Sequence, residues 1–271
     1  MMTPSDPIQS KVAIVIPVFN QLHYTRQCLE SLQRAGVADS QIIVINNAST
    51  DGTTEFLAAH PQIQTINNAE NRGCGFAWTQ GAKLSDKIWT IVMNNDVLVP
   101  PGCIEGLISF AEENRCDIVS PAMCEGEVDY DFATHAADFM RRLKDARRGS
   151  MAHGVCFMVH RRVFESIGYF DGDPKLGGYE DDEYFRRARG AGFRLAITGR
   201  AFLHHFGSIT QKSIRAGSGQ KRKSLGDREY YRRKIHQLKH AVRSFWWKHS
   251  ERMRFGRTLW EKRVGGVTKF Y

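Results

Sequence analysis

Three clusters of polar side chains in this sequence could carry chemistry. The first is Asn94-Asn95-Asp96, which follows the apolar run Ile88–Met93 and is closed by Pro100-Pro101. The second is the acidic run Glu180–Glu183, and the third is the pair His204-His205. Carboxylate and amide oxygens can act as ligands, and a carboxylate can act as a general base. Each cluster also has a structural alternative, since Asn and Asp favour turns and acids favour helix N-termini. The two histidines could simply lie at the edge of a strand with their imidazoles hydrogen-bonded.

The elements around the first cluster predict an α/β fold. Strands are expected at Lys11–Phe19, Gln41–Ile45, Ile63–Ile66 and Ile88–Met93. Helices are expected at Leu22–Ala35, Thr54–Ala59 and after Gly73. This alternation predicts a Rossmann-like, mostly parallel sheet flanked by helices, with right-handed crossovers.

The second half of the sequence is less regular. We expect Met123–Ser150 to be irregular apart from a helix around Ala136–Arg147, followed by a strand at 153–159 and a helix at 162–167. The acidic run should open another helix, because arginines fill its last turns. Gly177-Gly178 before that run also favours a close-approach backbone and a chemical role, so both interpretations stay open.

Amide-rich loops follow three of the predicted strands, at Asn46-Asn47, Asn71-Arg72-Gly73 and Asn94-Asn95-Asp96. The carboxyl ends of parallel strands meet at one edge of a sheet, where open α/β folds bind ligands. Asn side chains can pair with a base and ribose, and Arg72 offers a cation for phosphate. The sequence lacks GxGxxG after the first strand and lacks GxxxxGK[ST], which argues against a dinucleotide site or a P-loop.

Length and composition allow one large domain with a short extension. The 271 residues are 42% hydrophobic, which is enough for a sizeable core. The longest apolar run, Val12–Phe19, is too short to span a bilayer, and the N-terminus lacks the pattern of a signal peptide. The six cysteines form no CxxC pair, so we expect free thiols in a cytoplasmic protein.

The basic charge is concentrated near the C-terminus. Residues 212–271 contain 18 Lys and Arg and four Asp and Glu residues, a net charge of +14, whereas residues 1–211 have a net charge of −5. The mildly acidic body argues against nucleic acid as a partner. We therefore predict a main domain at 1–211 and a basic, α-helical extension at 212–271.

The extension contains an amphipathic pattern between residues 227 and 247. Its apolar residues recur at helical spacing and are Tyr231, Ile235, Leu238, Val242 and Phe245, with Trp246 and Trp247 after them. Two interpretations stay open. The helix could lie on the anionic inner face of a membrane, or it could pack on the catalytic body or on a second protomer as part of a homo-oligomer.

The ordered motifs resemble the N-terminal half of family-two glycosyltransferases with the GT-A fold. The similar segments are IPVFN at 16–20, VINNASTDGT at 44–53, NRGCGFA at 71–77 and the strand ending in NND at 94–96. Further along the chain, GYEDDEYFRRARGAGFRL at 178–195 resembles the acidic ED-containing segment of the same family. The resemblance covers about Lys11–Thr210 and points to a rhamnosyltransferase-like branch. It implies a GT-A-like sheet.

The resemblance also implies roles for the metal-binding and catalytic residues. In that family the last Asp of the NND segment, here Asp96, binds the Mn²⁺ or Mg²⁺ that bridges the donor diphosphate. A His at the position of His205 is commonly a metal or diphosphate contact. The Asp of the acidic pair, here Asp181, is the general base for the acceptor hydroxyl, with an ordinary pKa of about 4. Asn94 and Asn95 depart from a full DxD motif and leave one anionic ligand.

The resemblance implies two further groups of residues. The donor-binding group contains Asp96 together with Pro17, Phe19, Asn20, Asn46, Asn47, Arg72 and Asn95. The acceptor-binding group contains Tyr179, Glu180 and His153. Ser49 and Asp51 in the same loops can instead act only as helix caps.

The expected function is inverting transfer of a hexose or deoxyhexose from a UDP- or dTDP-linked sugar to a hydroxyl of a glycan or lipid-linked acceptor, in bacterial surface-glycan assembly. A nucleotidyltransferase would usually carry a Gly- and Arg-rich loop with a Lys after the first strand, which Val18–Tyr24 lacks. A non-catalytic nucleotide- or glycan-binding subunit is the other alternative, since NND contains a single acid.

Overall fold

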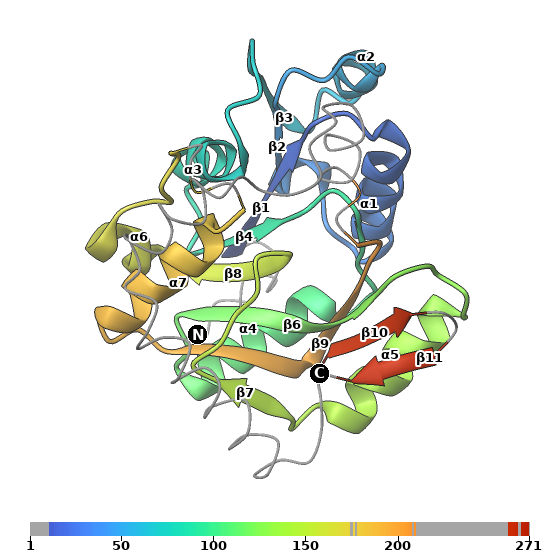
Figure 1. Cartoon of the computed structure of the whole chain (residues 1–271), viewed down its shortest axis with the longest axis vertical. Coiled ribbons are helices and arrows are strands. Elements are labelled where there is room, and N and C mark those ends of the chain that lie inside the picture. Colours follow the sequence, from blue (N-terminus) through green and yellow to red (C-terminus); the bar gives the residue numbers. More distant parts are fainter. Residues whose placement is uncertain are drawn as a thin grey trace, which may run out of the picture.

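The computed structural model describes residues 11–173, 176, 178–207 and 209, and the backbone of residues 260–264 and 267–270. The first half of the chain alternates strands and helices (Figure 1). Its elements are β1 (Val12–Val18), α1 (Leu22–Arg34), η2 (Asp39–Gln41), β2 (Ile42–Asn46), α2 (Thr53–Ala58), β3 (Gln64–Asn67), α3 (Cys74–Leu84), β4 (Trp89–Met93), β5 (Val97–Leu98) and α4 (Cys103–Asn114). The remaining elements are β6 (Ile118–Glu125), α5 (Phe132–Leu143), β7 (Arg147–Gly149), β8 (Cys156–His160), α6 (Arg161–Ile167), α7 (Glu180–Gly190), β9 (Leu195–His205), β10 (Trp260–Val264) and β11 (Val267–Phe270).

The described strands form one 11-stranded sheet whose main path runs β11-β10-β6-β8-β4-β1-β2-β3. β1 pairs in parallel with β2 and β4, and β2 pairs in parallel with β3, as the strand–helix alternation predicts. β8 enters between β4 and β6 and is antiparallel to both. The predicted α/β class is therefore confirmed, with a mixed sheet that is parallel in its N-terminal half.

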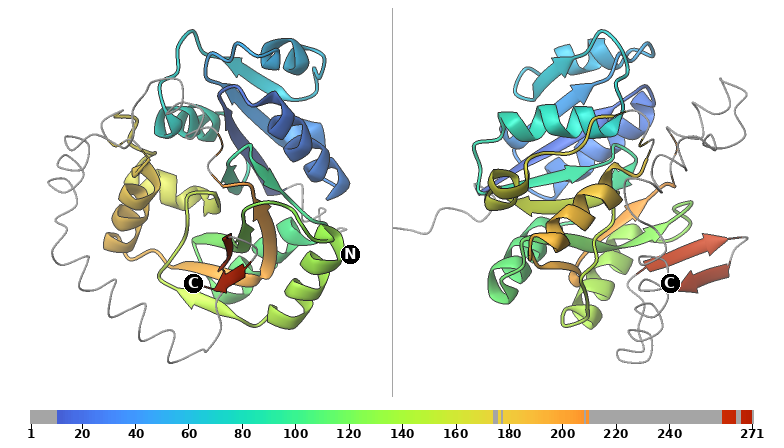
Figure 2. Two further views of the ribbon diagram at one scale, coloured as in Figure 1. Left: turned by 45° about the vertical axis from the view of Figure 1, so that its right-hand side comes forward. Right: turned by 60° about the vertical axis from the view of Figure 1, so that its left-hand side comes forward.

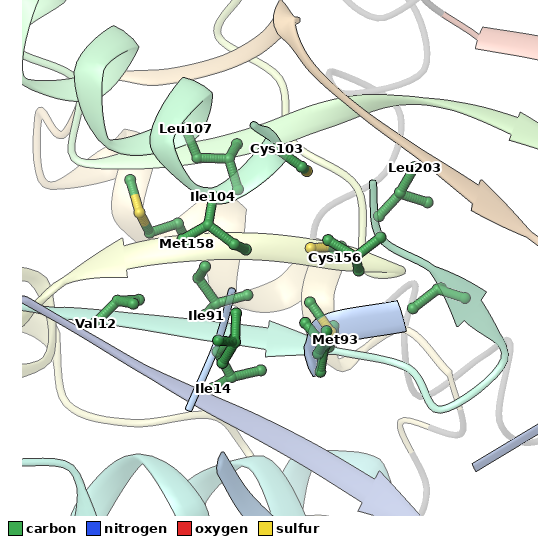
Figure 3. Close-up of a cluster of buried hydrophobic side chains, with 14 of the residues drawn as sticks. Val12, Ile14, Ile91, Met93, Cys103, Ile104, Leu107, Cys156, Met158 and Leu203 are labelled. Carbon is green, nitrogen blue, oxygen red and sulfur yellow. The ribbon is translucent and has the colours of Figure 1, made fainter. Parts of the chain in front are cut away.

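Side chains alternate between the two faces of β1, and this alternation builds two separate cores. Val12, Ile14 and Ile16 join a core under α1 and α4, while Ala13 and Val15 join a core under α3, α6 and α7. Figure 3 shows the first core, in which strand residues such as Ile91 and Met158 lie beneath Ile104 and Leu107 of α4. The left view of Figure 2 shows α1 (blue) and α7 (gold) on opposite sides of the strands.

The segment 123–150 corrects the expectation of an irregular stretch. β6 continues past Pro121 to Glu125, α5 begins after the Asp131 cap, and β7 pairs with β9. Proline has no N–H for a ladder, and the β6–β9 register shifts between Pro121 and Ala122. This irregularity lets the strand continue beyond a residue that normally ends one.

Two elements of the C-terminal 60 residues join the same sheet. β10 pairs in parallel with β6, and β11 pairs antiparallel with β10, so both extend the sheet beyond β6 (Figure 1). The predicted amphipathic helix at 227–247 lies outside the described residues, as does Gly177. The domain boundary between residues 211 and 212 stays a prediction. All six cysteines are free thiols in the structure.

Candidate active site

The end of β9 brings His205 beside Asp96. β5 pairs antiparallel with the last residues of β9, and Val97 lies opposite His205 in the register. This pairing places Asp96 Oδ1 3.4 Å from His205 Nε2. The structure thus joins two of the residues that the sequence predicts as metal or diphosphate contacts, although they lie far apart along the chain.

Asp96 is buried but held in its ionised form. The residue is 3% exposed, and burial by itself would raise the pKa of the carboxyl. The hydrogen bond and charge of His205 and the backbone N–H of Ile209 outweigh this effect and lower the pKa below its usual value. The Ile209 N–H donates to Oδ2 over 3.0 Å, and the Phe206 N–H donates to the Asp96 carbonyl over 3.0 Å. Asp96 therefore offers a fixed negative charge at this edge.

The Asp96–His205 pair fits part of a divalent metal site. A carboxylate oxygen and an imidazole nitrogen 3.4 Å apart can both reach one ion. Within the described part of the chain, no group of three or more His, Cys, Asp and Glu residues is placed to hold a metal. Mg²⁺ and similar hard cations are often bound by one or two protein groups, with substrate phosphates and water completing the shell. The residues present fit that kind of shared site.

The two neighbouring histidines, His204 and His153, have other contacts. His204 Nδ1 is 2.8 Å from the Tyr130 hydroxyl and its Nε2 is 2.8 Å from the Gly126 carbonyl, so both ring nitrogens are engaged away from Asp96. His153 Nε2 lies 2.8 Å from the carbonyl of Pro121. Burial lowers the pKa of each ring to about 4, which keeps both imidazoles neutral at physiological pH.

The acidic run forms the first turn of α7, and its four side chains differ in environment. Glu183 is buried and pairs with Arg187 Nε over 2.9 Å, while the same guanidinium donates to the carbonyls of Ile167 and Tyr169. Glu183 therefore anchors the helix, as the structural interpretation of the run expects. Asp182 is exposed, Glu180 is buried, and Asp181 is half-buried.

Asp181 has the environment of a base rather than of an ordinary surface carboxylate. Loss of solvent around its carboxyl and the nearby charge of Asp182 raise its pKa to about 7, above the ordinary value expected from sequence. A general base is most effective when its pKa is close to the working pH. The first turn of α7 thus presents one carboxylate that can accept a proton near neutral pH.

The predicted donor-binding amides tie the loops after β1, β2 and β3 together. Asn46 donates to Thr54 Oγ1 (3.0 Å) and to Asn67 Oδ1 (2.8 Å), and its Oδ1 accepts from the Ser49 N–H. Asn47 Oδ1 accepts from Asn68 Nδ2 over 2.8 Å. Because the Asn46 side chain is fully engaged in these bonds, it shapes the edge of the sheet and holds the neighbouring loops in place.

The remaining donor-side residues surround the same loops. Asn20, at φ 56°, accepts the Thr50 N–H over 2.7 Å, and Asn95 Nδ2 donates to Thr25 Oγ1 over 2.9 Å. Pro17 lies opposite Ile45 in the sheet, and Phe19 follows at the end of β1.

Arg72 is exposed, and its guanidinium stacks 3.5 Å above the Phe76 ring at the start of α3. Asp51 accepts N–H bonds from Leu22 and Thr53, which supports its capping role.

A family model described as Glycosyl transferase family 2 matches residues 13–168, which is more than half of the chain. The chain belongs to this family. Its members transfer glycosyl groups, and the match includes the Asn94-Asn95-Asp96 turn. Asp181 and His205 lie beyond the matched residues. The structure places His205 beside Asp96, whereas the role of Asp181 stays a prediction.

Two relatives of this family 2 protein align with about four fifths of its sequence. Glycosyltransferase AglE of Haloferax volcanii is 25% identical over 240 residues, which cover 82% of this chain and 77% of that protein. The uncharacterized glycosyltransferase YwdF of Bacillus subtilis is 27% identical, covering 80% of this chain and 82% of that protein.

Two solved structures share the fold of this family 2 protein. GalNAc-T7 with UDP, GalNAc and Mn²⁺ has a TM-score of 0.58 at 16% identity and covers 72% of this chain. The mannosyltransferase PcManGT from Pyrobaculum calidifontis, in complex with GDP-Man and Mn²⁺, has a TM-score of 0.55 at 16% identity and covers 80% of this chain. The chain spans 43% and 66% of these two proteins. The likeness confirms the GT-A-like α/β fold.

A helix that crosses a bilayer needs about 20 mostly apolar residues. In the described part of this family 2 protein, no helix is long and apolar enough to cross a membrane.

Proposed function

We propose that this protein is an inverting, metal-dependent glycosyltransferase of a rhamnosyltransferase-like branch. It moves a hexose or deoxyhexose from a UDP- or dTDP-linked donor to an acceptor hydroxyl. The observation that carries the proposal is the pairing of Asp96 with His205 at 3.4 Å on the edge where the amide-rich loops meet. A buried, ionised carboxylate beside an imidazole suits a cation that is shared with a diphosphate.

The donor diphosphate would lie against Asp96 and His205, with Arg72 as a further cation for its phosphates and with Asn20 and Asn47 on the nucleoside side. A bound Mn²⁺ or Mg²⁺ would neutralise charge on the diphosphate as it leaves. Asp181 accepts the proton of the acceptor hydroxyl while the oxygen forms its bond to the anomeric carbon and the bond to the diphosphate breaks. Attack from the face opposite the leaving group inverts the configuration, so no carboxylate nucleophile is needed.

The acceptor is proposed to contact the start of α7, where Tyr179, Glu180 and Asp181 are consecutive, together with His153. A glycan or lipid-linked acceptor of a bacterial surface-glycan pathway fits this proposal. The alternative, a non-catalytic nucleotide- or glycan-binding subunit, is favoured by one observation only. Asn94 and Asn95 leave Asp96 as the single acid of its turn.

A nucleotide panel tests the proposal and separates it from the binding-subunit alternative. We expect UDP or dTDP with Mn²⁺ to raise the melting temperature, because a ligand at a hundred times its Kd stabilises a protein by about 2.7 kcal/mol. UMP, which lacks the diphosphate, is the matched control and should give a much smaller shift. Slow hydrolysis of the matching sugar donor should accompany binding. Binding without any hydrolysis or transfer would favour the non-catalytic subunit.

The basic segment 212–271 is proposed to hold the enzyme on the anionic cytoplasmic face of a membrane. Its net charge is +14, against −5 for residues 1–211, and each basic residue near an anionic surface contributes about 1 kcal/mol before screening. We expect the full chain to float with vesicles rich in anionic phospholipid at low salt. It should not float with neutral vesicles, and high salt should release it from the anionic ones. A chain that stays at the bottom of the gradient with anionic vesicles at low salt would overturn the membrane proposal.

A further inference from the structure

Gly154 lies directly against the carboxylate of Asp181. A Cβ atom built on Gly154 would overlap Asp181 Oδ2 and would lie 2.6 Å from Cγ and 2.9 Å from Cβ of the same side chain. Separations under 3.0 Å essentially never occur for real Cβ atoms, so one side must move if Gly154 gains a side chain. The α-carbon of Gly154 thus forms one wall of the space that holds the carboxylate.

The backbone on both sides of Gly154 is anchored and cannot easily retreat. The His153 N–H donates to Ser120 Oγ over 3.1 Å, and the His153 ring lies 2.8 Å from the Pro121 carbonyl, so residue 153 is held to β6. On the other side, the Val155 carbonyl accepts the Asn94 N–H over 2.9 Å. The short segment 153–155 therefore connects β6 to the turn that contains Asp96.

The first turn of α7 is also confined from its other side. At Gly75 of α3, a Cβ atom would overlap the Asp171 carbonyl oxygen and lie 3.0 Å from Glu180 Cγ. Glu180 and Asp181 are therefore enclosed between α3 and segment 153–155. A displaced Asp181 carboxylate would have to turn toward solvent, since α7 has little room to shift toward α3.

We infer that Gly154 is a positioning residue, which sets where the Asp181 carboxylate stands relative to the Asp96 turn. The inference rests on the proposed role of Asp181 as general base. The requirement for glycine is spatial, because Gly154 is absent from the residues with left-handed φ and alanine would fit its backbone. Any side chain at residue 154 would push the base out of place while the donor side kept its shape.

The test is Gly154→Ala, with Gly149→Ala as the matched control. Gly149 lies five residues earlier and also has an ordinary φ, and a Cβ atom added there would meet no other atom within 4 Å. We expect Gly154→Ala to lower kcat on the order of a hundredfold, since a misplacement of about 1 Å can cost that much. The KM for the donor should change by less than about twofold. The control should keep normal kcat and KM.

The pH profile supplies a readout that a general loss of structure would not move. In the unaltered protein, kcat should fall as pH decreases through about 7, where Asp181 becomes protonated. In Gly154→Ala the displaced carboxylate of Asp181 is exposed to water. The fall of kcat at acidic pH should therefore move to lower pH, toward the ordinary aspartate pKa of about 4. An unchanged pH profile together with unchanged kcat would overturn the inference.

A stability cycle keeps the inference testable even if Gly154→Ala folds poorly. The free energy of unfolding is measured for Gly154→Ala, Asp181→Ala and the double variant. Truncating Asp181 to alanine removes its Oδ2 and Cγ, the two nearest atoms that the new methyl group meets, and leaves only its Cβ at 2.9 Å. The double variant should therefore recover much of the stability lost by Gly154→Ala. If the stability losses of the two single variants simply add in the double variant, the contact between residue 154 and Asp181 does not cause the loss in Gly154→Ala, and the inference is overturned. The cycle needs no catalysis, so it separates failure of this inference from failure of the proposed base.

Discussion

Replacing Asp181 by asparagine is expected to lower the rate of glycosyl transfer by about a hundred- to ten-thousand-fold, the usual contribution of a general base. The amide keeps the shape of the side chain beside Gly154 but cannot accept the acceptor proton. Donor binding should stay close to normal, because Asp96 and His205 are unaffected. The measurement is steady-state transfer with a matched donor and acceptor, alongside calorimetry with the nucleoside diphosphate.

The matched control is Asp182→Asn at the exposed neighbour. The charge of Asp182 helps to raise the pKa of Asp181, so the control should shift the acidic limb of the pH profile slightly downward and keep most of the rate. The assignment would be wrong if Asp181→Asn retained more than about a tenth of the normal turnover. A tenfold loss is much smaller than the loss expected when a general base is removed. Asp182 would then be the next candidate.

The Asp181→Asn variant should also be more stable than the unaltered protein at alkaline pH. The folded-state pKa of Asp181 is raised from 3.8 to about 7, so its ionisation disfavours folding, and stability is lost as pH rises from about 4 to about 7. Each pKa unit corresponds to about 1.4 kcal/mol, and partial solvent contact reduces the effect, so a gain of about 1–3 kcal/mol is expected at pH 8. The gain should disappear near pH 4, where both side chains are neutral. Thermal unfolding at the two pH values measures it.

Replacing Asp96 by asparagine is expected to remove most metal-dependent binding of the nucleoside diphosphate. The Ile209 N–H needs an acceptor, so the amide oxygen should face it and the amide NH₂ should face His205 and the site. An NH₂ group cannot bind a cation. We expect affinity in Mn²⁺ to fall by at least the ten- to hundredfold that loss of an outer-shell partner costs a metal site.

Calorimetric titration of UDP or dTDP with and without Mn²⁺ measures this loss. Asp117→Asn is the control, because Asp117 is another buried aspartate, bonded to Arg162 and to the Arg194 N–H. That change should reduce stability and leave nucleotide affinity unaltered. Equal affinities for the unaltered protein and Asp96→Asn, with and without Mn²⁺, would point instead to a site that works without a metal.

The sequence alone determined the elements whose patterns are local. The apolar runs of β1 and β4 and the arginines that close α7 all follow from residues within one element. The parallel pairing of β1 with β2 and β4 follows from the strand–helix alternation. The polar turn at Asn94-Asn95-Asp96 was equally visible, because its residue types stand out directly after an apolar strand.

Elements that depend on distant partners could not be predicted in this way. β5 has two residues and exists because β9 pairs with it, and β6 passes through Pro121 because β9 shifts register there. α4 begins after Gly102, without a polar side-chain cap to mark its start. In each case the stabilising contact comes from another part of the chain.

The tertiary structure alone decided the geometry of the site. The resemblance of the motifs had already singled out Asp96, His205 and Asp181, but only the pairing of β5 with β9 shows that His205 lies beside Asp96. The contact between Gly154 and Asp181 joins segments that no local pattern relates. Burial by the folded chain and the nearby charge of Asp182 raise the pKa of Asp181, because a carboxylate loses hydration only when the chain closes around it.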